Sequence, residues 1–383
     1  MKKRSTKIIW LLVAFLFTMS FVLPSASAVP QDLELDGAAA VLMEQGTNRV
    51  LYAQNENEKL APASTTKVMT CILAIENGDL DKVVTVSKNA SGVEGSSIWL
   101  SQGEHITLGD LLYGLMLSSG NDAAVAIAEE IGGSVDGFVE MMNNKAKEIG
   151  ALNTNFANPN GLPDDNHYTT AYDLALICSY AMQNETFRTI VSTEYKEISW
   201  EGHEYLRVLK NKNKLLWQYD GCTGIKTGYT KSAGKCLTSA ACRDGMGLVA
   251  VVLNDGDLWE DCRDLLDYGF ENYKQYSIIN KNDYLGTVNV KNGTSKVINA
   301  YAGEDITYPL TDEEYGNISV QIQLEDSVDA PVEAGRKVGE ITIKLGDEVL
   351  SIIPITAKEA IPKNTFKYNL EKILNIWYNH IYE

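Results

Sequence analysis

The sequence is short of several features that mark particular classes of protein. Among its 383 residues are four histidines and nine prolines, and 33 Lys and Arg face 51 Asp and Glu, for a formal charge of −18. A nucleic-acid-binding function is disfavoured, because such proteins need a basic face to neutralise phosphates. The histidines are scattered and no H-E-x-x-H motif occurs, which argues against a zinc site. We therefore expect neither a metal nor a cofactor.

The six cysteines do not form an evident disulfide pattern, and no C-x-x-C motif occurs. Cys71 and Cys178 lie within helical apolar patterns, where a buried free thiol is the usual finding. Cys236 and Cys242 would share one face of a strand. They would then stand about 20 Å apart, which is too far for a bridge. We expect no structural disulfides.

Residues 1–28 have the three parts of a secretory signal peptide. Four basic residues stand in the first seven, an apolar run of 16 residues follows from Ile8 to Leu23, and Ala26-Ser27-Ala28 supplies a cleavage site. An uncleaved membrane anchor is the alternative, but a bilayer span needs about 20 residues. Cleavage would remove four bases and no acids, leaving 355 residues with a charge of 29 − 51 = −22. No second apolar run in the sequence is long enough to span a bilayer.

Residues 29–277 mix helical and strand patterns, which predicts an α/β domain. A β-hairpin is expected near the start of this region, over 37–53. Apolar residues with a helical period predict helices over 64–76, most of 107–149, and 172–183. From about residue 222 the chain turns to strands, and a closing helix is expected over 260–275.

The last third of the chain has a different character. Short alternating runs separated by turns predict a small all-β sandwich over 278–362. The tail, 363–383, instead places its apolar residues on one face of a helix: Phe366, Leu370, Ile373, Leu374, Trp377 and Ile381. We expect this amphipathic helix to bind a membrane surface. The alternative is that it packs on the all-β module.

Three short motifs carry the candidate chemistry: Ser64-Thr65-Thr66-Lys67, Ser119-Gly120-Asn121 and Lys226-Thr227-Gly228. In the first, the i, i+3 spacing puts Ser64 and Lys67 on one helical face. A lysine whose pKa is lowered by apolar neighbours can accept the serine proton. Each motif alone is common, because Ser and Asn often cap helices and Gly often marks turns. Together, in this order, they match the set of penicillin-binding proteins and class A β-lactamases.

On these motifs the chain resembles the low-molecular-mass penicillin-binding proteins, the serine-type D-alanyl-D-alanine carboxypeptidases of peptidase family S11. The likeness extends to the segments around the motifs: 61–67, 117–123, 158–162 and 224–230. The resemblance implies a β-lactamase-like transpeptidase domain over 29–277, followed by the all-β domain and the amphipathic helix. The middle motif departs from the S-D-N form, with Gly120 at its centre.

The resemblance also implies the catalytic roles. Ser64 would attack the carbonyl of the penultimate D-alanine and form an acyl-enzyme, with Lys67 as the base. Ser119 would relay a proton to the leaving D-alanine, and Asn121 would hold Lys67 or the substrate amide. No glutamate is assigned to deacylation, so the base for that step stays open.

Substrate binding would fall to the third motif. Lys226 and Thr227 would bind the terminal carboxylate, and Gly228 belongs to the same binding strand. The backbone N–H groups of Ser64 and Tyr229 would form the oxyanion hole. The implied substrate is the peptidoglycan pentapeptide stem, β-lactams would be inhibitors, and the enzyme would work at the outer face of the cytoplasmic membrane or in the cell wall.

Two alternatives stay open. A class A-like β-lactamase is disfavoured by Gly120, the extra β domain and the tail. A non-catalytic penicillin-binding sensor is disfavoured because a dead site need not keep Ser64, Lys67, Ser119 and Lys226.

Overall fold

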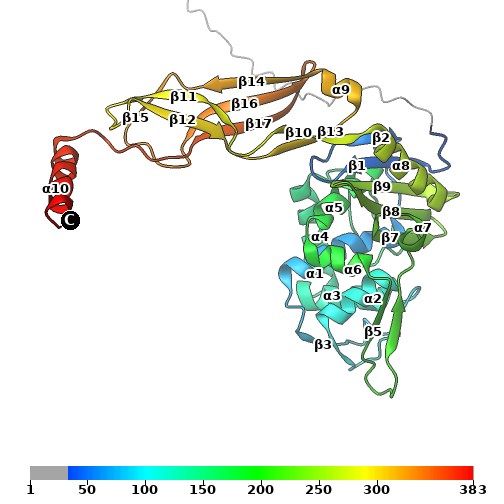
Figure 1. Cartoon of the computed structure of the whole chain (residues 1–383). Helices are drawn as coiled ribbons and strands as arrows, with labels where there is room; N and C mark the ends of the chain where they lie inside the picture. The colour runs from blue at the N-terminus through cyan, green and yellow to red at the C-terminus, as the bar shows by residue number, and fades with distance from the viewer. Residues whose placement is uncertain (1–32, 383) are drawn as a thin grey trace, which may run out of the picture. The chain divides into compact units, whose positions relative to one another are not determined.

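A five-stranded antiparallel sheet lies at the centre of the first part of the chain. The computed structural model describes residues 33–382 (Figure 1), so the predicted signal peptide, 1–28, falls outside the described residues. The strand order is β2-β1-β9-β8-β7. The strands are β1 (Ala39–Glu44), β2 (Val50–Gln54), β7 (Cys222–Thr230), β8 (Gly234–Arg243) and β9 (Met246–Asp255).

Helices cover both faces of this sheet. All six residues of β1 are buried, because successive side chains point to opposite faces and each face has its own apolar core. Val41 belongs to the larger core and Leu42 to the smaller one. The larger core is completed by α1 (Lys67–Asn77), α2 (Leu108–Leu117), α3 (Asn121–Gly132), α4 (Val135–Ile149), α5 (Ala171–Met182) and α6 (Glu185–Ser192), and the smaller one by α7 (Leu215–Gln218) and α8 (Leu258–Asn272).

Most of these elements were predicted from the sequence. The hairpin over 37–53 is the β1–β2 pair, and the closing helix is α8. Helix α6 and two short ribbons were not predicted. The ribbons pair β3 (Val83–Thr85) with β4 (His105–Thr107), and β5 (Tyr195–Ile198) with β6 (Arg207–Lys210). Each is only three or four residues long and partly exposed, so its apolar pattern is too short to stand out.

The β-rich part of the chain confirms the all-β prediction. A six-stranded sheet has the order β14-β16-β17-β12-β11-β15. Its strands are β11 (Tyr284–Lys291), β12 (Val297–Ala302), β14 (Ile318–Leu324), β15 (Ser327–Asp329), β16 (Lys337–Leu345) and β17 (Glu348–Ala357). A separate pair joins β10 (Lys274–Ile279) to β13 (Ile306–Leu310), and α9 (Asp312–Gly316) follows. Alternate residues such as Ile341 and Ile343 fill one apolar core.

Helix α10 (Phe366–Tyr382) ends the described chain. Its apolar face is open to solvent, since Phe366 is 83% and Trp377 is 70% exposed. Within residues 33–382, no helix is long and apolar enough to cross a bilayer.

Candidate active site

Ser64 stands at the entrance to α1, on the short 3-10 turn Ala63–Thr66. Its side chain is partly exposed, whereas Lys67, at the first position of α1, is completely buried. The preceding residue, Ala63, has a φ of +49°, which a residue with a side chain rarely adopts. The sequence therefore places a reachable hydroxyl directly above a buried amine, as the i, i+3 spacing predicts.

Lys67 makes three close polar contacts. Its Nζ lies 3.0 Å from Oγ of Ser64, 2.7 Å from Oδ1 of Asn121 and 2.5 Å from the carbonyl oxygen of Asn160. Burial, followed by the positive charges of Lys226 and Lys212, holds the pKa of Lys67 well below its ordinary value. A neutral amine donates two N–H groups, which the oxygens of Asn121 and Asn160 accept. Its lone pair is then left for the hydroxyl of Ser64.

The middle motif lies on the turn between α2 and α3. Asn121 is fixed on three sides: its backbone N–H donates to the carbonyl of Ser96 at 2.7 Å, its Nδ2 donates to the carbonyl of Glu94, and its Oδ1 faces Lys67. Ser119 is 4% exposed and has a φ of +64°. The structure thus brings Asn121 into contact with Lys67 and places Ser119 two residues away, on the same turn.

The third motif lies on β7, beside the Ser64 turn. A Cβ added to Gly228 would stand 3.0 Å from the backbone N of Ser64 and 3.1 Å from Cβ of Ala63. Only a glycine lets the strand approach this closely. Lys226 is 1% exposed, and burial, with the charge of Lys212 second, lowers its pKa to about 7. Thr227 is partly exposed and Tyr229 is 66% exposed, so the outer side of β7 is accessible.

Lys212 is a third lysine close to the motifs. It was not predicted from the sequence. Its Nζ donates to Oγ of Ser96 at 3.1 Å, and burial lowers its pKa. The positive charge of Lys212 in turn lowers the pKa values of Lys67 and Lys226. Nothing in the run Asn211–Lys214 distinguishes this lysine from a surface lysine before the chain is folded.

The loop 158–162 is a second feature whose role was missed. Its sequence resembles the corresponding segment of the family, but it does not predict a site residue. The carbonyl of Asn160 contacts Lys67, and the carbonyl of Pro159 accepts from Oγ1 of Thr70 at 2.6 Å. Gly161 has a φ of +83°, and a Cβ there would stand 1.9 Å from the carbonyl oxygen of Ala63. The backbone of this loop therefore contacts both Lys67 and the turn that carries Ser64.

His167 has a supporting position behind the same turn. Its Nδ1 accepts from the backbone N–H of Ala157 at 3.0 Å, so its Nε2 carries the proton and donates to Oγ1 of Thr66, 2.7 Å away. Burial lowers its pKa to about 4, which keeps the ring neutral. This histidine positions the residue before Lys67.

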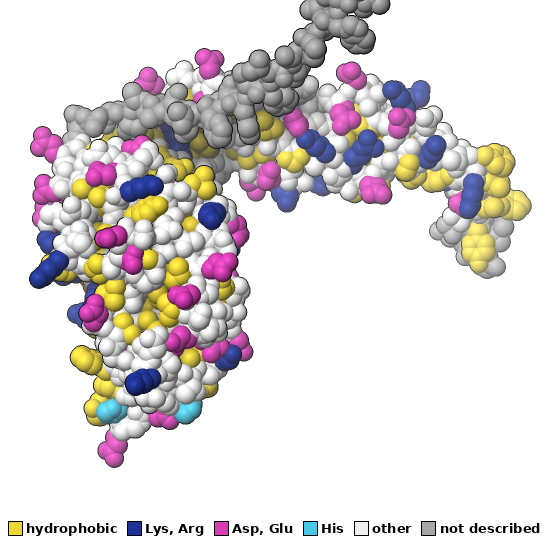
Figure 2. All heavy atoms as spheres, turned by 180° about the vertical axis from the view of Figure 1, so that it is seen from behind, with side chains coloured by type: hydrophobic (Ala, Val, Ile, Leu, Met, Phe, Trp, Pro, Cys, Tyr) yellow, Lys and Arg dark blue, Asp and Glu magenta, His cyan; other side chains and the backbone are white. Residues whose placement is uncertain are grey.

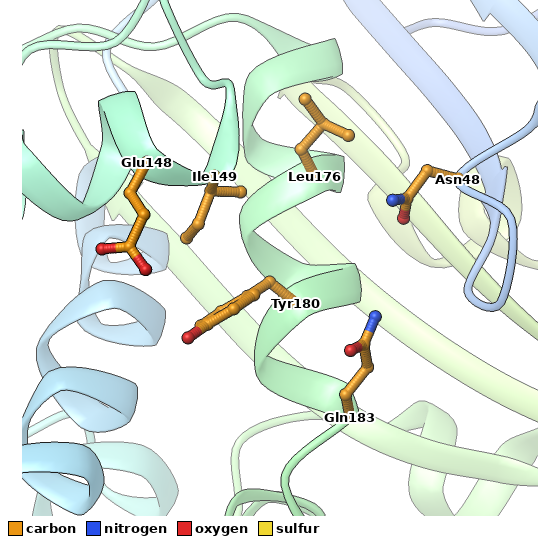
Figure 3. A pocket seen from close by; sticks show the side chains of 6 residues that line it. All are labelled: Asn48, Glu148, Ile149, Leu176, Tyr180 and Gln183. Carbon is orange, nitrogen blue, oxygen red and sulfur yellow. The ribbon is translucent and has the colours of Figure 1, made fainter. Parts of the chain in front are cut away.

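A separate pocket of about 210 Å³ carries no comparable chemistry. Figure 3 shows its six lining side chains, which come from the end of α4, from α5 and the residue after it, and from the turn after β1: Asn48, Glu148, Ile149, Leu176, Tyr180 and Gln183. They include no serine, cysteine or lysine that could act as a nucleophile or base. This pocket therefore lacks the pairing of serine with lysine that is found at Ser64.

Comparison with known proteins gives two family matches. Residues 25–257 match the family model described as D-alanyl-D-alanine carboxypeptidase, and residues 273–363 match that of the penicillin-binding protein 5 C-terminal domain. The chain is 37% identical to the D-alanyl-D-alanine carboxypeptidase DacF of Bacillus subtilis, over 90% of this chain and 91% of the relative. It is 31% identical to DacC of Escherichia coli, over 92% and 91%.

Solved structures agree with these matches. Penicillin-binding protein 5 from Haemophilus influenzae superposes with a TM-score of 0.74 at 26% identity, over 87% of this chain and 99% of that one. A variant of the Streptomyces K15 DD-transpeptidase superposes with a TM-score of 0.60 at 34% identity, over 63% of this chain and 100% of that one. The predicted fold class is thereby confirmed.

The close contact of Gly161 with Ala63 generates a first prediction. Gly161→Ala should displace the Ser64 turn, and a shift of about 1 Å should slow labelling of the protein by a fluorescent penicillin roughly 100-fold. Gly133→Ala is the matched control, because Gly133 has a φ of +70° but a Cβ there would meet nothing within 4 Å. Equal labelling rates in the two variants would contradict this role of Gly161.

Proposed function

The chain belongs to the D-alanyl-D-alanine carboxypeptidase family, peptidase family S11, and on that basis we propose that it removes the terminal D-alanine from peptidoglycan pentapeptide stems. The observation that carries the proposal is the 3.0 Å contact of the hydroxyl of Ser64 with the amine of Lys67, a buried lysine whose pKa is held well below its ordinary value by burial. A serine hydroxyl becomes a useful nucleophile only when an adjacent base takes its proton. The relatives named above are carboxypeptidases by name.

Acylation would begin with proton transfer from Ser64 to Lys67. The Oγ attacks the carbonyl carbon of the penultimate D-alanine, and the negative charge that develops on the carbonyl oxygen needs two N–H donors. We assign these to the backbone of Ser64 and Tyr229, since the close approach at Gly228 brings β7 beside the Ser64 turn. The proton then passes through Ser119 to the leaving D-alanine amine.

The substrate carboxylate would bind at Lys226 and Thr227. An approaching carboxylate favours the charged form of Lys226 and so raises its lowered pKa. Lys212 adds positive charge to the same region. Lys226 and Lys212 thus favour an anionic peptide end, although the protein as a whole has a formal charge of −18.

Water would complete the cycle by hydrolysing the acyl-enzyme. We assign its deprotonation to the Lys67 and Ser119 pair, so that the same groups serve both half-reactions. β-Lactams would enter as substrate mimics, because they offer a strained amide next to a carboxylate, and would leave a slowly hydrolysed acyl-enzyme on Ser64.

Ser64→Ala should abolish both labelling by a fluorescent penicillin and D-alanine release from a pentapeptide. The reason is that no acyl-enzyme can form without the hydroxyl. The measurement is gel fluorescence together with a coupled D-alanine assay, with Ser232→Ala, on the turn after β7, as the control that should keep both. Labelling that survives in Ser64→Ala would remove Ser64 as the nucleophile.

The same assay separates the alternatives. Rapid penicillin turnover without D-alanine release would favour a β-lactamase, and labelling without either turnover would favour a sensor. The likeness to a DD-transpeptidase covers 63% of this chain. Adding an acceptor amine to the same assay would reveal whether the acyl group is also transferred to an amine.

We further propose that the protein is exported and held at the membrane surface by α10. The division into a signal peptide over 1–28, an enzyme domain over 29–277, an all-β domain over 278–362 and an anchor over 363–383 belongs to this proposal. Its support is the exposed apolar face of α10, on which Ile373 is 62% exposed. Such a face, on a helix too short and polar to span a bilayer, suits an interfacial position.

Truncation after residue 362 should move the protein from the membrane fraction to the soluble fraction with penicillin labelling kept. Ile373→Glu should weaken membrane binding in the same direction, because it puts a charge on the apolar face. Asn375→Glu, off that face, is the matched control. Unchanged fractionation of the truncated protein would overturn the anchor.

A further inference from the structure

Three aromatic side chains of the β5–β6 hairpin contact one another, and Arg207 links them to the backbone of Trp99, in the segment before α2. We call this group, Trp99, Trp200, His203 and Tyr205, the aromatic platform. Trp99 is 72% and Tyr205 is 61% exposed. Figure 2 shows hydrophobic side chains next to histidines at the lower end of the molecule, where Figure 1 draws β5. A patch of large exposed aromatic rings is typical of a site that binds a ligand or another molecule.

The backbone at Trp99 is built to present its ring. Trp99 has a φ of +63°, which bulky residues seldom adopt. The neighbouring N–H groups of Ile98 and Leu100 donate to the buried carboxylate of Asp122 at 3.1 and 3.0 Å. The N–H of Trp99 itself donates to Oγ of Ser97 at 2.8 Å. Unfavourable backbone held in place by its surroundings is typical of binding sites.

Arg207 joins the two halves of the platform. Its Nη2 donates to Oε1 of Glu104 at 2.9 Å and to the carbonyl of Trp99 at 3.4 Å, while its guanidinium lies 4.6 Å from the ring centre of Trp200. Arg207 and Glu104 are both nearly completely buried. The platform is therefore preorganised without a ligand, which lowers the entropic cost of binding.

The hairpin rings brace one another. The ring centres of Trp200 and His203 lie 4.2 Å apart, and those of Trp200 and Tyr205 lie 5.6 Å apart at nearly right angles. Trp200 is thus held between Arg207 and its neighbours, whereas Tyr205 keeps most of its surface free. His203 is exposed as well, but Trp99 and Tyr205 are the two large rings of the platform that are open to solvent.

The segment that carries Trp99 also contacts residues of the candidate active site. Ser96, three residues before Trp99, accepts a hydrogen bond from the backbone of Asn121 and another from Lys212. Asp122, which anchors Ile98 and Leu100, follows Asn121 directly. The chain segment that presents Trp99 is thus fixed to the turn that holds Asn121 against Lys67.

We propose that the aromatic platform binds the glycan strand that carries the stem peptide, a neutral polysaccharide of N-acetylated hexosamines; this rests on the proposed function. The apolar face of a sugar ring stacks on an aromatic face, and its hydroxyls donate to nearby acceptors. Glu204, exposed at the hairpin tip, supplies an acceptor, and so does the exposed Glu201, whose carboxylate also accepts from the backbone N–H of His105 and faces its ring Nδ1. The same two carboxylates repel the free carboxylates of a stem peptide, so the chemistry favours the glycan.

Kinetics on two substrates test the proposal in the full mature protein. For Trp99→Ala/Tyr205→Ala, KM on uncross-linked glycan chains bearing pentapeptides should rise about tenfold with kcat kept, since each lost stacking contact costs a few-fold in affinity. On a short diacylated tripeptide ending in D-Ala-D-Ala, the KM and kcat of this variant should stay within about twofold of those of the unchanged protein. Tyr284→Ala, which removes a 59% exposed tyrosine from β11, is the matched control.

Direct binding supplies a readout that needs no catalysis. The Ser64→Ala protein should retain glycan strands stripped of their peptides, and the added Trp99→Ala/Tyr205→Ala change should abolish retention. Equal losses on polymer and tripeptide would overturn the proposal in favour of a stem-peptide contact, and no loss on either would overturn it outright. If the wild-type protein releases no D-alanine, the proposed function fails instead, and glycan retention still decides this proposal.

Discussion

The contact between the amine of Lys67 and the hydroxyl of Ser64 depends on keeping water away from the amine. Lys67 is completely buried, and burial is the largest cause of its lowered pKa. A charged ammonium in that position would have no lone pair for the serine proton. The two oxygens that accept its N–H groups come from Asn121 and Asn160, which are far apart in sequence, so the fold must bring three segments to one point.

Glycines make this convergence possible. β7 can lie against the Ser64 turn only because Gly228 has no side chain, and the loop 158–162 can do so only because Gly161 has none. The central sheet holds β7 in place. Packing among the helices on one face of the sheet holds α1 and α3. The same constraint extends outward, because Asp122 beside Asn121 also accepts from the backbone N–H groups of Ile98 and Leu100, on either side of Trp99.

The three motifs could be found in the sequence because each is a contiguous run with a known spacing, and the main helices and strands because their apolar periods are long. Lys212 and the carbonyl of Asn160 could not. A backbone carbonyl has no sequence signature, and Lys212 is one lysine in a polar run that becomes important only when folding buries it near Lys67. The aromatic platform was missed for a similar reason, since Trp99 lies about a hundred residues before Trp200 and the two are linked only through Arg207.

The charge state of Lys67 in the free enzyme is the most direct test of this account. Lysine-selective NMR titration of the mature protein, with the Lys67 signal assigned by its loss in Lys67→Met, measures it. Because a lysine is neutral above its pKa, the lowered value predicts that the signal titrates far below 10.5, leaving the amine neutral well before ordinary lysines lose their proton. A midpoint close to 10.5 would mean a charged Lys67 at working pH and would contradict its assignment as the base.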